Sequence, residues 1–130
     1  MNLKDYFENR QGLGVLATAD AEGKVDVAVY ARPHVTDDET VAFIMADRLS
    51  HANVQANPHA AYLFHEKGPG YEGVRLHLTK TGEETSPTKI QEVRRRTTPD
   101  ICKGEEGAQR FLVTFRVDRV RPLIGDGEVE

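Results

Sequence analysis

Short runs in which apolar and polar residues alternate recur along most of the chain. The clearest run places Val25, Val27 and Val29 in alternation with Asp26, Ala28 and Tyr30. A period of two is typical of a β-strand with two different faces. Comparable runs predict strands at residues 13–18, 25–35, 40–45, 59–65, 74–84 and 110–120. Six short strands with small helices between them favour a mainly β fold, a closed or partly closed antiparallel barrel.

Three segments have the features of short helices. Residues 3–10 carry apolar side chains at the three- and four-residue spacing of an amphipathic helix. Residues 50–56 follow a predicted strand, and Ser50 belongs to the residue types that cap helix N-termini. A third helix is expected to begin at Ser86-Pro87, because proline is tolerated in a first turn.

Turn residues separate these elements, and one proline lies inside a predicted strand. Pro33 cannot donate a hydrogen bond to a neighbouring strand, so the 25–35 strand is expected to lie at an edge or to contain a bulge. No internal repeat or low-complexity linker divides the 130 residues. We therefore expect a single domain over residues 1–130.

Composition and charge exclude several classes of function. The net charge of −4 argues against a sequence-independent nucleic-acid binder, which needs a basic face. The basic cluster at 94–96 lies in a segment of mixed charge, which indicates a solvated helix face. Cys102 is the only cysteine, so no internal disulfide can form. No signal peptide and no apolar stretch of the roughly 20 residues that span a membrane are present, so we expect a cytoplasmic protein.

The histidines do not form a recognisable metal site. The five histidines are His34, His51, His59, His65 and His77. None forms a helical i, i+4 pair, and no acidic or cysteine ligand stands at a recognised spacing from two of them. No nucleophile–base pair is visible either, because Ser50 and His51 are consecutive residues at a helix start and point in different directions. We expect no bound metal, and no catalytic residue can be named.

The segment from Met45 to Pro58 brings a cation, a hydroxyl and a helix start into one turn. The unpaired N–H groups of the helix start, the helix dipole and the guanidinium of Arg48 converge where a phosphate could bind. Ser50 would cap the helix and contact the same phosphate. An ordinary capped turn with a solvated arginine explains the same residues, so physical features alone leave both interpretations open.

The order of motifs adds further information. Residues 40–65 contain, in this order, a predicted strand, Arg-Leu-Ser-His, Asn-Val, Asn-Pro and a second predicted strand. This arrangement resembles the FMN-binding split-barrel family typified by pyridoxamine 5'-phosphate oxidase, over about residues 6–123. The likeness is greatest to its small, stand-alone members. Leu49 and Ser50 stand where larger members often carry Lys or Arg, so this chain has less positive charge there.

The resemblance implies a fold, a cofactor and a site. The fold would be a six-stranded antiparallel split β-barrel, and the cofactor FMN, bound at the interface of a homodimer. Arg48, Leu49, Ser50 and the backbone around His51 would hold the phosphate, whereas Ala28, Val29 and Tyr30 would line the isoalloxazine ring. The second strand is where split-barrel proteins make backbone contacts to the flavin, and its small residues leave room for a flat ring.

The expected function is FMN binding with electron or hydride transfer, in an oxidoreductase or electron carrier whose small-molecule donor and acceptor are unknown. One alternative is a split-barrel reductase that uses a deazaflavin, whose acidic tail calls for more basic residues. Another is a barrel that binds a small ligand or partner without redox chemistry. Oxidation of pyridoxamine phosphate is less favoured, because the chain ends in the acidic segment 125–130, which repels phosphate.

Overall fold

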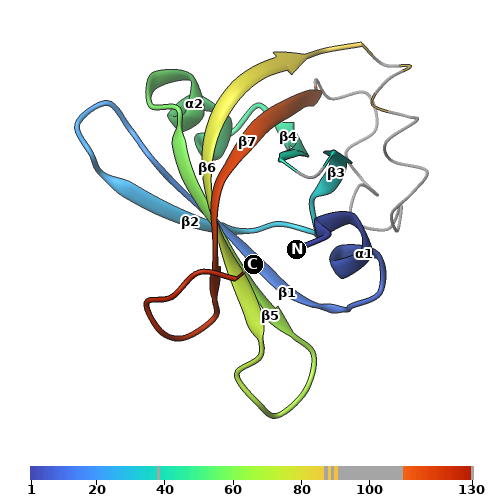
Figure 1. The fold of residues 1–130 in the computed structure, drawn as a ribbon. Helices are drawn as coiled ribbons and strands as arrows, with labels where there is room; N and C mark the ends of the chain where they lie inside the picture. Colours follow the sequence, from blue (N-terminus) through green and yellow to red (C-terminus); the bar gives the residue numbers. More distant parts are fainter. Residues whose placement is uncertain (38, 87, 89, 91–109, 130) are drawn as a thin grey trace.

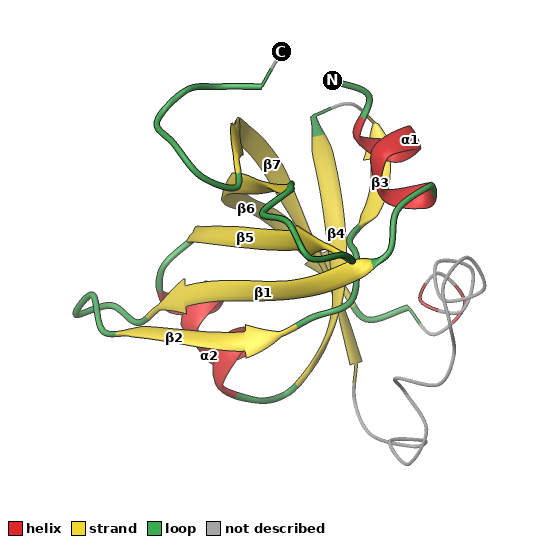
Figure 2. Ribbon diagram, turned by 90° about the horizontal axis from the view of Figure 1, so that it is seen from below, coloured by secondary structure: helices red, strands yellow, loops and turns green. Residues whose placement is uncertain are grey.

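The computed structural model describes residues 1–37, 39–86, 88, 90 and 110–129. Their strands form one antiparallel sheet in the order β2-β1-β5-β6-β7-β4-β3 (Figures 1 and 2). The strands are β1 (Gly12–Ala19), β2 (Val25–Val29), β3 (His34–Asp37), β4 (Thr40–Ala46), β5 (His59–Glu66), β6 (Gly73–Glu84) and β7 (Arg110–Pro122). The helices are α1 (Leu3–Glu8) and α2 (Leu49–Ala56). The predicted fold class, a mainly β antiparallel split barrel, is confirmed.

The sheet has seven strands rather than the six expected, because the predicted 25–35 strand is divided. Its first half is β2, which pairs with β1, and its second half is β3, which pairs with β4. These two halves form the opposite edges of the sheet. Pro33 lies between them and is buried. Because proline lacks the N–H that continued pairing requires, the chain leaves one edge there and crosses to the other.

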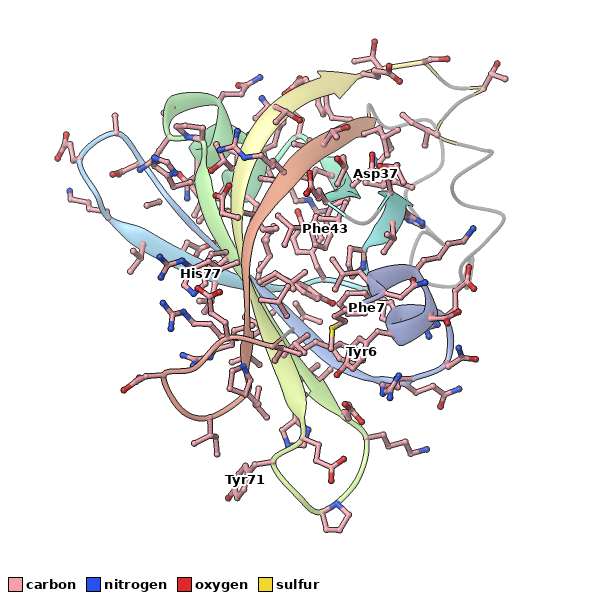
Figure 3. The ribbon with its side chains drawn as sticks, in the orientation of Figure 1. Tyr6, Phe7, Asp37, Phe43, Tyr71 and His77 are labelled. Atoms are coloured by element: carbon pink, nitrogen blue, oxygen red, sulfur yellow. The ribbon has the colours of Figure 1, made fainter. Side chains whose placement is uncertain are left out.

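The curved sheet encloses an aromatic core that α1 closes on one side. Phe7 of α1 and Phe43 of β4 point into this interior, whereas Tyr71 lies on the loop between β5 and β6 (Figure 3). Phe7 packs edge-on against Phe64 at 5.4 Å between ring centroids. The fully buried core side chains include Leu16, Val41, Phe43, Met45, Tyr62, Phe64, Leu76, Val113 and Phe115. Burial of this apolar surface is the main contribution that holds the sheet in its curved form.

Helix α2 lies against the end of β1 and connects β4 to β5. The amide of Asn53 donates to the hydroxyl of Thr18 at 3.0 Å, and both side chains are buried. The amide of Asn57 donates to the carbonyl of Asp20 at 3.3 Å. These two bonds fix the middle and the C-terminal end of the helix relative to the β1–β2 hairpin.

One prediction about this helix is wrong: Ser50 is not its N-cap. The helix begins at Leu49, the N-cap position belongs to Arg48, and the Arg48 side chain makes no capping hydrogen bond. Ser50 is therefore the second residue of the first turn. The backbone of Arg48 is extended, with φ −132° and ψ −168°, as an N-cap requires. Backbone geometry rather than a side-chain cap begins the helix.

Several predictions fall on positions outside the described residues. They include most of the helix expected after Ser86, the basic cluster at 94–96 and Cys102. In the described part of the chain, no helix has the length and apolar character needed to cross a membrane.

Candidate functional site

The turn between β4 and α2 exposes the start of a helix. The first helical hydrogen bond runs from the Ala52 N–H to the Arg48 carbonyl at 3.0 Å. The N–H groups of Leu49, Ser50 and His51 therefore precede the i→i−4 ladder, which leaves them without helical acceptors. Arg48 is exposed, and Leu49 is 57% exposed beside it. The turn thus combines a cation with open backbone donors, as an anion site requires.

Ser50 differs from its two neighbours because it is buried. Its exposure is only 5%, and within the described residues its hydroxyl forms no hydrogen bond. A buried hydroxyl without a partner is unfavourable by about 1–3 kcal/mol. A phosphate oxygen placed at the open helix start would accept a bond from this hydroxyl as well as from the backbone. The residues present therefore fit a phosphate group.

His51 is buried deeper still, and its side chain packs against the sheet. Its exposure is 2%, and its ring stacks on Phe111 of β7 at 3.8 Å between centroids with a 17° interplanar angle. Nδ1 lies 3.2 Å from a carboxylate oxygen of Asp47, and Nε2 lies 3.2 Å from both carboxylate oxygens of Glu83. The side chain is part of the support of the turn, whereas its backbone N–H remains at the helix start.

Glu83 of β6 is a member of this group that the sequence did not reveal. Burial by itself would raise the pKa of Glu83, but hydrogen bonds from Lys80 and His51 outweigh that effect, so its pKa lies below the ordinary value. The Lys80 Nζ is 2.6 Å from the carboxylate. Glu83 is separated from His51 by 32 residues. No local sequence pattern links two residues at that separation, and only the sheet brings them together.

The predicted ring platform lies on β2, but its side chains do not share a face. Ala28 pairs with buried Leu16 and faces the interior, whereas Val29 is 71% exposed on the outer face. The ring of Tyr30 packs inward against Phe43 at 5.8 Å between centroids. Among the described strands, β2 pairs only with β1, so its other edge is open. The structure brings the backbone of these residues, rather than their side chains, to one edge.

The backbone just after β2 is held by Tyr62, another residue that the sequence reasoning missed. The Tyr62 hydroxyl lies 3.2 Å from the Tyr30 carbonyl and 3.1 Å from the Ala31 carbonyl, to which it donates. Burial of the phenol raises its pKa well above the ordinary value, so the hydroxyl stays protonated and can donate. The Tyr30 N–H donates in turn to the Gly14 carbonyl at 3.0 Å.

Gly14 makes this arrangement possible because it has no side chain. A Cβ at this position would lie 1.8 Å from the Tyr62 hydroxyl and 2.5 Å from the Tyr30 carbonyl oxygen. Both distances are far below a van der Waals contact. Glycine at position 14 thus lets the 30–31 backbone approach β1 and Tyr62 closely.

In the described part of the chain, no group of three or more His, Cys, Asp or Glu side chains is arranged to hold a metal ion. The His51 ring forms hydrogen bonds with Asp47 and Glu83, and His77 accepts a hydrogen bond from Arg121 at 3.2 Å. Both side chains therefore have structural partners in the described chain.

Several solved structures share this fold. HupZ of Group A Streptococcus has 19% identity and a TM-score of 0.72, over 98% of this chain and 96% of that protein. An FMN-binding protein of Syntrophomonas wolfei has 15% identity and a TM-score of 0.74, over 96% and 86%. An F420 reductase has 20% identity and a TM-score of 0.59, over 91% of each chain. At these identities the likeness concerns the fold.

No curated protein is significantly similar to the sequence. The sequence model of the pyridoxamine 5'-phosphate oxidase family, in contrast, matches residues 3–122. This match covers α1, all seven strands and the β4–α2 turn, and it confirms the resemblance drawn from the motifs. The chain therefore belongs to the pyridoxamine 5'-phosphate oxidase family.

Proposed function

We propose that this protein binds FMN, with the phosphate at the β4–α2 turn and the ring along the open edge of β2. The observation that carries the proposal is the buried Ser50 hydroxyl, which has no described partner and lies at an open helix start beside Arg48. A phosphate would accept bonds from this hydroxyl, from the N–H groups of residues 49–51 and from the guanidinium. Leu49, exposed between them, would shield one side of the ligand.

The isoalloxazine ring has a polar pyrimidine edge that needs backbone donors and acceptors. The open edge of β2 supplies them, and the Tyr62 hydroxyl fixes the carbonyls of Tyr30 and Ala31 at its end. The small side chain of Ala28 lets a flat ring approach the strand. When bound, the flavin supplies electron or hydride transfer, while the chain holds and orients it.

A second copy of the chain would cover the other side of the flavin. Val25, Val27 and Val29 of β2 are 79%, 65% and 71% exposed, so the outer face of the edge strand is apolar along its length. Leu63 of β5 shares this face through its pairing with Val15, which also pairs with Val29. An exposed apolar face of this kind commonly marks an interface. A homodimer would bury it and enclose the cofactor.

Titration of the purified protein with FMN, riboflavin and a deazaflavin with an acidic tail, followed by flavin fluorescence, tests the proposal. FMN binding that is much tighter than riboflavin binding is the expected result, because riboflavin lacks the phosphate. Preference for the deazaflavin would favour the reductase alternative, as in the F420 reductase of similar fold. Failure to bind any of the three ligands would favour the alternative of a barrel that binds a small ligand or partner without redox chemistry. If FMN does bind, oxidation of NADH or NADPH by the FMN-loaded protein tests whether the protein is an oxidoreductase.

A further inference from the structure

The outer face of the sheet carries a cluster of basic side chains on β6 and β7. Arg75 pairs directly with Arg121, and His77 pairs directly with Arg119. Because directly paired residues of antiparallel strands point to the same face, these four side chains lie together. His77 lies on the side of the sheet opposite to the core residue Phe43 (Figure 3). The cluster is therefore outside the barrel.

This concentration of positive charge is unfavourable by itself. Like charges directly opposite each other on paired strands repel. Burial lowers the pKa of His77, and the neighbouring charges of the three arginines lower it further. The ring accepts a hydrogen bond from Nε of Arg121 at 3.2 Å, as a neutral imidazole can. The cluster thus calls for a negative counterpart.

The C-terminal segment 124–129 lies against the cluster but supplies only part of that counterpart. Arg75 donates to the carbonyl of Gly125, and Nη1 of Arg121 donates to the carbonyl of Asp126 at 2.6 Å. Both acceptors are main-chain oxygens without a net charge. Among the described residues, no carboxylate pairs with either of these two guanidinium groups.

One carboxylate of the segment does reach the cluster. Oε1 of Glu128 lies 3.3 Å from Nε of Arg119. The two side chains are 57% and 55% exposed, so the ion pair is weak and opens readily. The next residue, Val129, donates its N–H to the carbonyl of Val120 at 2.8 Å. The Glu128 carboxylate can therefore move away from Arg119 while the main chain of the segment stays in place.

The guanidinium groups keep donors that the described chain does not use. Nη1 of Arg75, Nη2 of Arg121 and both Nη groups of Arg119 have no acceptor among the described residues. Guanidinium N–H groups bind pairs of phosphate or carboxylate oxygens in a fork geometry. Three such groups side by side favour an anion with two charges and several oxygens, such as a phosphate group, over a monocarboxylate.

We propose that Arg75, Arg119 and Arg121 form a site for the phosphate group of a small molecule, and that Glu128 occupies this site as a built-in competitor. The phosphate would replace the Glu128 carboxylate beside Arg119, while the carbonyl bonds keep the other two guanidinium groups oriented. Arg75 lies near the start of β6, whereas the β4–α2 turn meets β6 near its other end. The proposal is therefore independent of the proposed FMN site.

The first test is an NMR titration of the flavin-free protein with inorganic phosphate at constant ionic strength. We expect the Nε–H signals of the three arginines and the amide signals of residues 128 and 129 to shift with one common dissociation constant. Acetate at the same concentration should shift them much less. Shifts confined to residues 48–52, or no shifts at all, would overturn the proposal.

The second test compares variants of the full chain. Arg121→Gln and Arg119→Gln should each weaken phosphate binding at this site at least tenfold, the effect of one hydrogen bond to a charged group. Arg116→Gln is the matched control, because Arg116 is an exposed arginine of the same strand that already pairs with Asp118 at 2.8 Å. Arg48→Ala should also leave this site unchanged.

The Arg119 side chain is exposed, so Arg119→Gln is expected to fold even if Arg121→Gln does not. A phosphate affinity of Arg119→Gln equal to that of Arg116→Gln would contradict the proposal. A loss of binding in Arg48→Ala alone would assign the phosphate to the β4–α2 turn and would likewise overturn the second site.

Glu128→Gln tests the built-in competitor. Without the Glu128 carboxylate, phosphate affinity should rise roughly two- to fivefold, the strength of an exposed ion pair. Glu22→Gln is the matched control, because Glu22 is an exposed glutamate that lies 3.9 Å from Lys24 in the β1–β2 turn. Both variants change the net charge equally. A phosphate affinity of Glu128→Gln no higher than that of Glu22→Gln would overturn the competitor role.

Discussion

Arg48 and Ser50 are two residues apart, yet one is exposed and the other is 5% exposed. Arg48 can therefore meet a ligand from solvent, whereas Ser50 can meet it only at the base of the turn. The two positions offer different interactions, a charge for Arg48 and a hydrogen bond in a desolvated place for Ser50. Their substitutions should have different consequences.

Arg48→Ala should weaken FMN binding by about 1.5–3 kcal/mol, the range for a hydrogen bond to a charged group. Riboflavin affinity should stay unchanged, because that ligand lacks the phosphate. Fluorescence titration of both flavins checks this, with Lys67→Ala on the β5–β6 loop as a control that removes an exposed cation elsewhere. Equal FMN affinity in the parent and in Arg48→Ala would show that Arg48 does not bind the phosphate.

Ser50→Ala should separate a ligand contact from a structural role. Because Ser50 is not the helix cap, the variant should keep the stability of the ligand-free protein or gain up to about 1 kcal/mol from losing a buried, unpaired hydroxyl. With saturating FMN the variant should be less stable than the parent, since a ligand stabilises the fold according to its affinity. Thermal unfolding with and without FMN measures both differences. If the variant and the parent differ in stability by the same amount with and without FMN, Ser50 does not contact the phosphate.

The residue types predicted the β4–α2 turn, but they did not predict the distant side chains that hold the site in place. The sequence located Arg48 and a helix start nearby, because capping preferences are local. It misplaced the cap by two residues, since Ser50 fits a cap by residue type and only the backbone shows that Arg48 holds that position. Glu83, Phe111 and Tyr62 were missed because their contacts depend on strand pairing across the sheet.

At the level of elements, Pro33 decides where the chain changes edges. The alternating pattern predicted one strand over 25–35, but residues 30–33 are not in a strand, and a pattern cannot show that the two parts, β2 and β3, pair with β1 and β4. The positions of the other strands were predicted to within a few residues. Strand order was not, because an antiparallel period of two is the same whichever neighbour a strand pairs with.

Gly14→Ala tests the close approach of β1, β5 and the backbone after β2. The new Cβ would meet the Tyr62 hydroxyl and the Tyr30 carbonyl, so we expect a loss of about 1–3 kcal/mol in the free energy of unfolding. Gly82→Ala in β6 is the matched control, because nothing lies within 4 Å of its added Cβ. Chemical denaturation compares the two. A Gly14→Ala variant as stable as Gly82→Ala would show that Tyr62 does not need its present position.

For the whole molecule, the exposed valines of β2 are the feature that its own fold does not explain. An edge strand with an apolar outer face is a liability unless something covers it. The face continues through Val15 to Leu63 on β5, so a partner would meet an apolar surface three strands wide. A second copy in an isologous arrangement would cover two such faces at once and enclose a flavin at each β2 edge.

Val27→Asp tests this assembly, because it places a charge at the centre of the exposed valines while leaving the core intact. We expect sedimentation to show a dimer for the parent and a monomer for Val27→Asp. FMN affinity should fall with the loss of the dimer, since one flank of the flavin would become exposed. Tyr71→Asp is the control: Tyr71 is also strongly exposed, at 75%, but lies on the loop between β5 and β6 (Figure 3). A monomeric parent that binds FMN tightly would refute the interface site, and the open edge of β2 would then have to hold the ring without a partner.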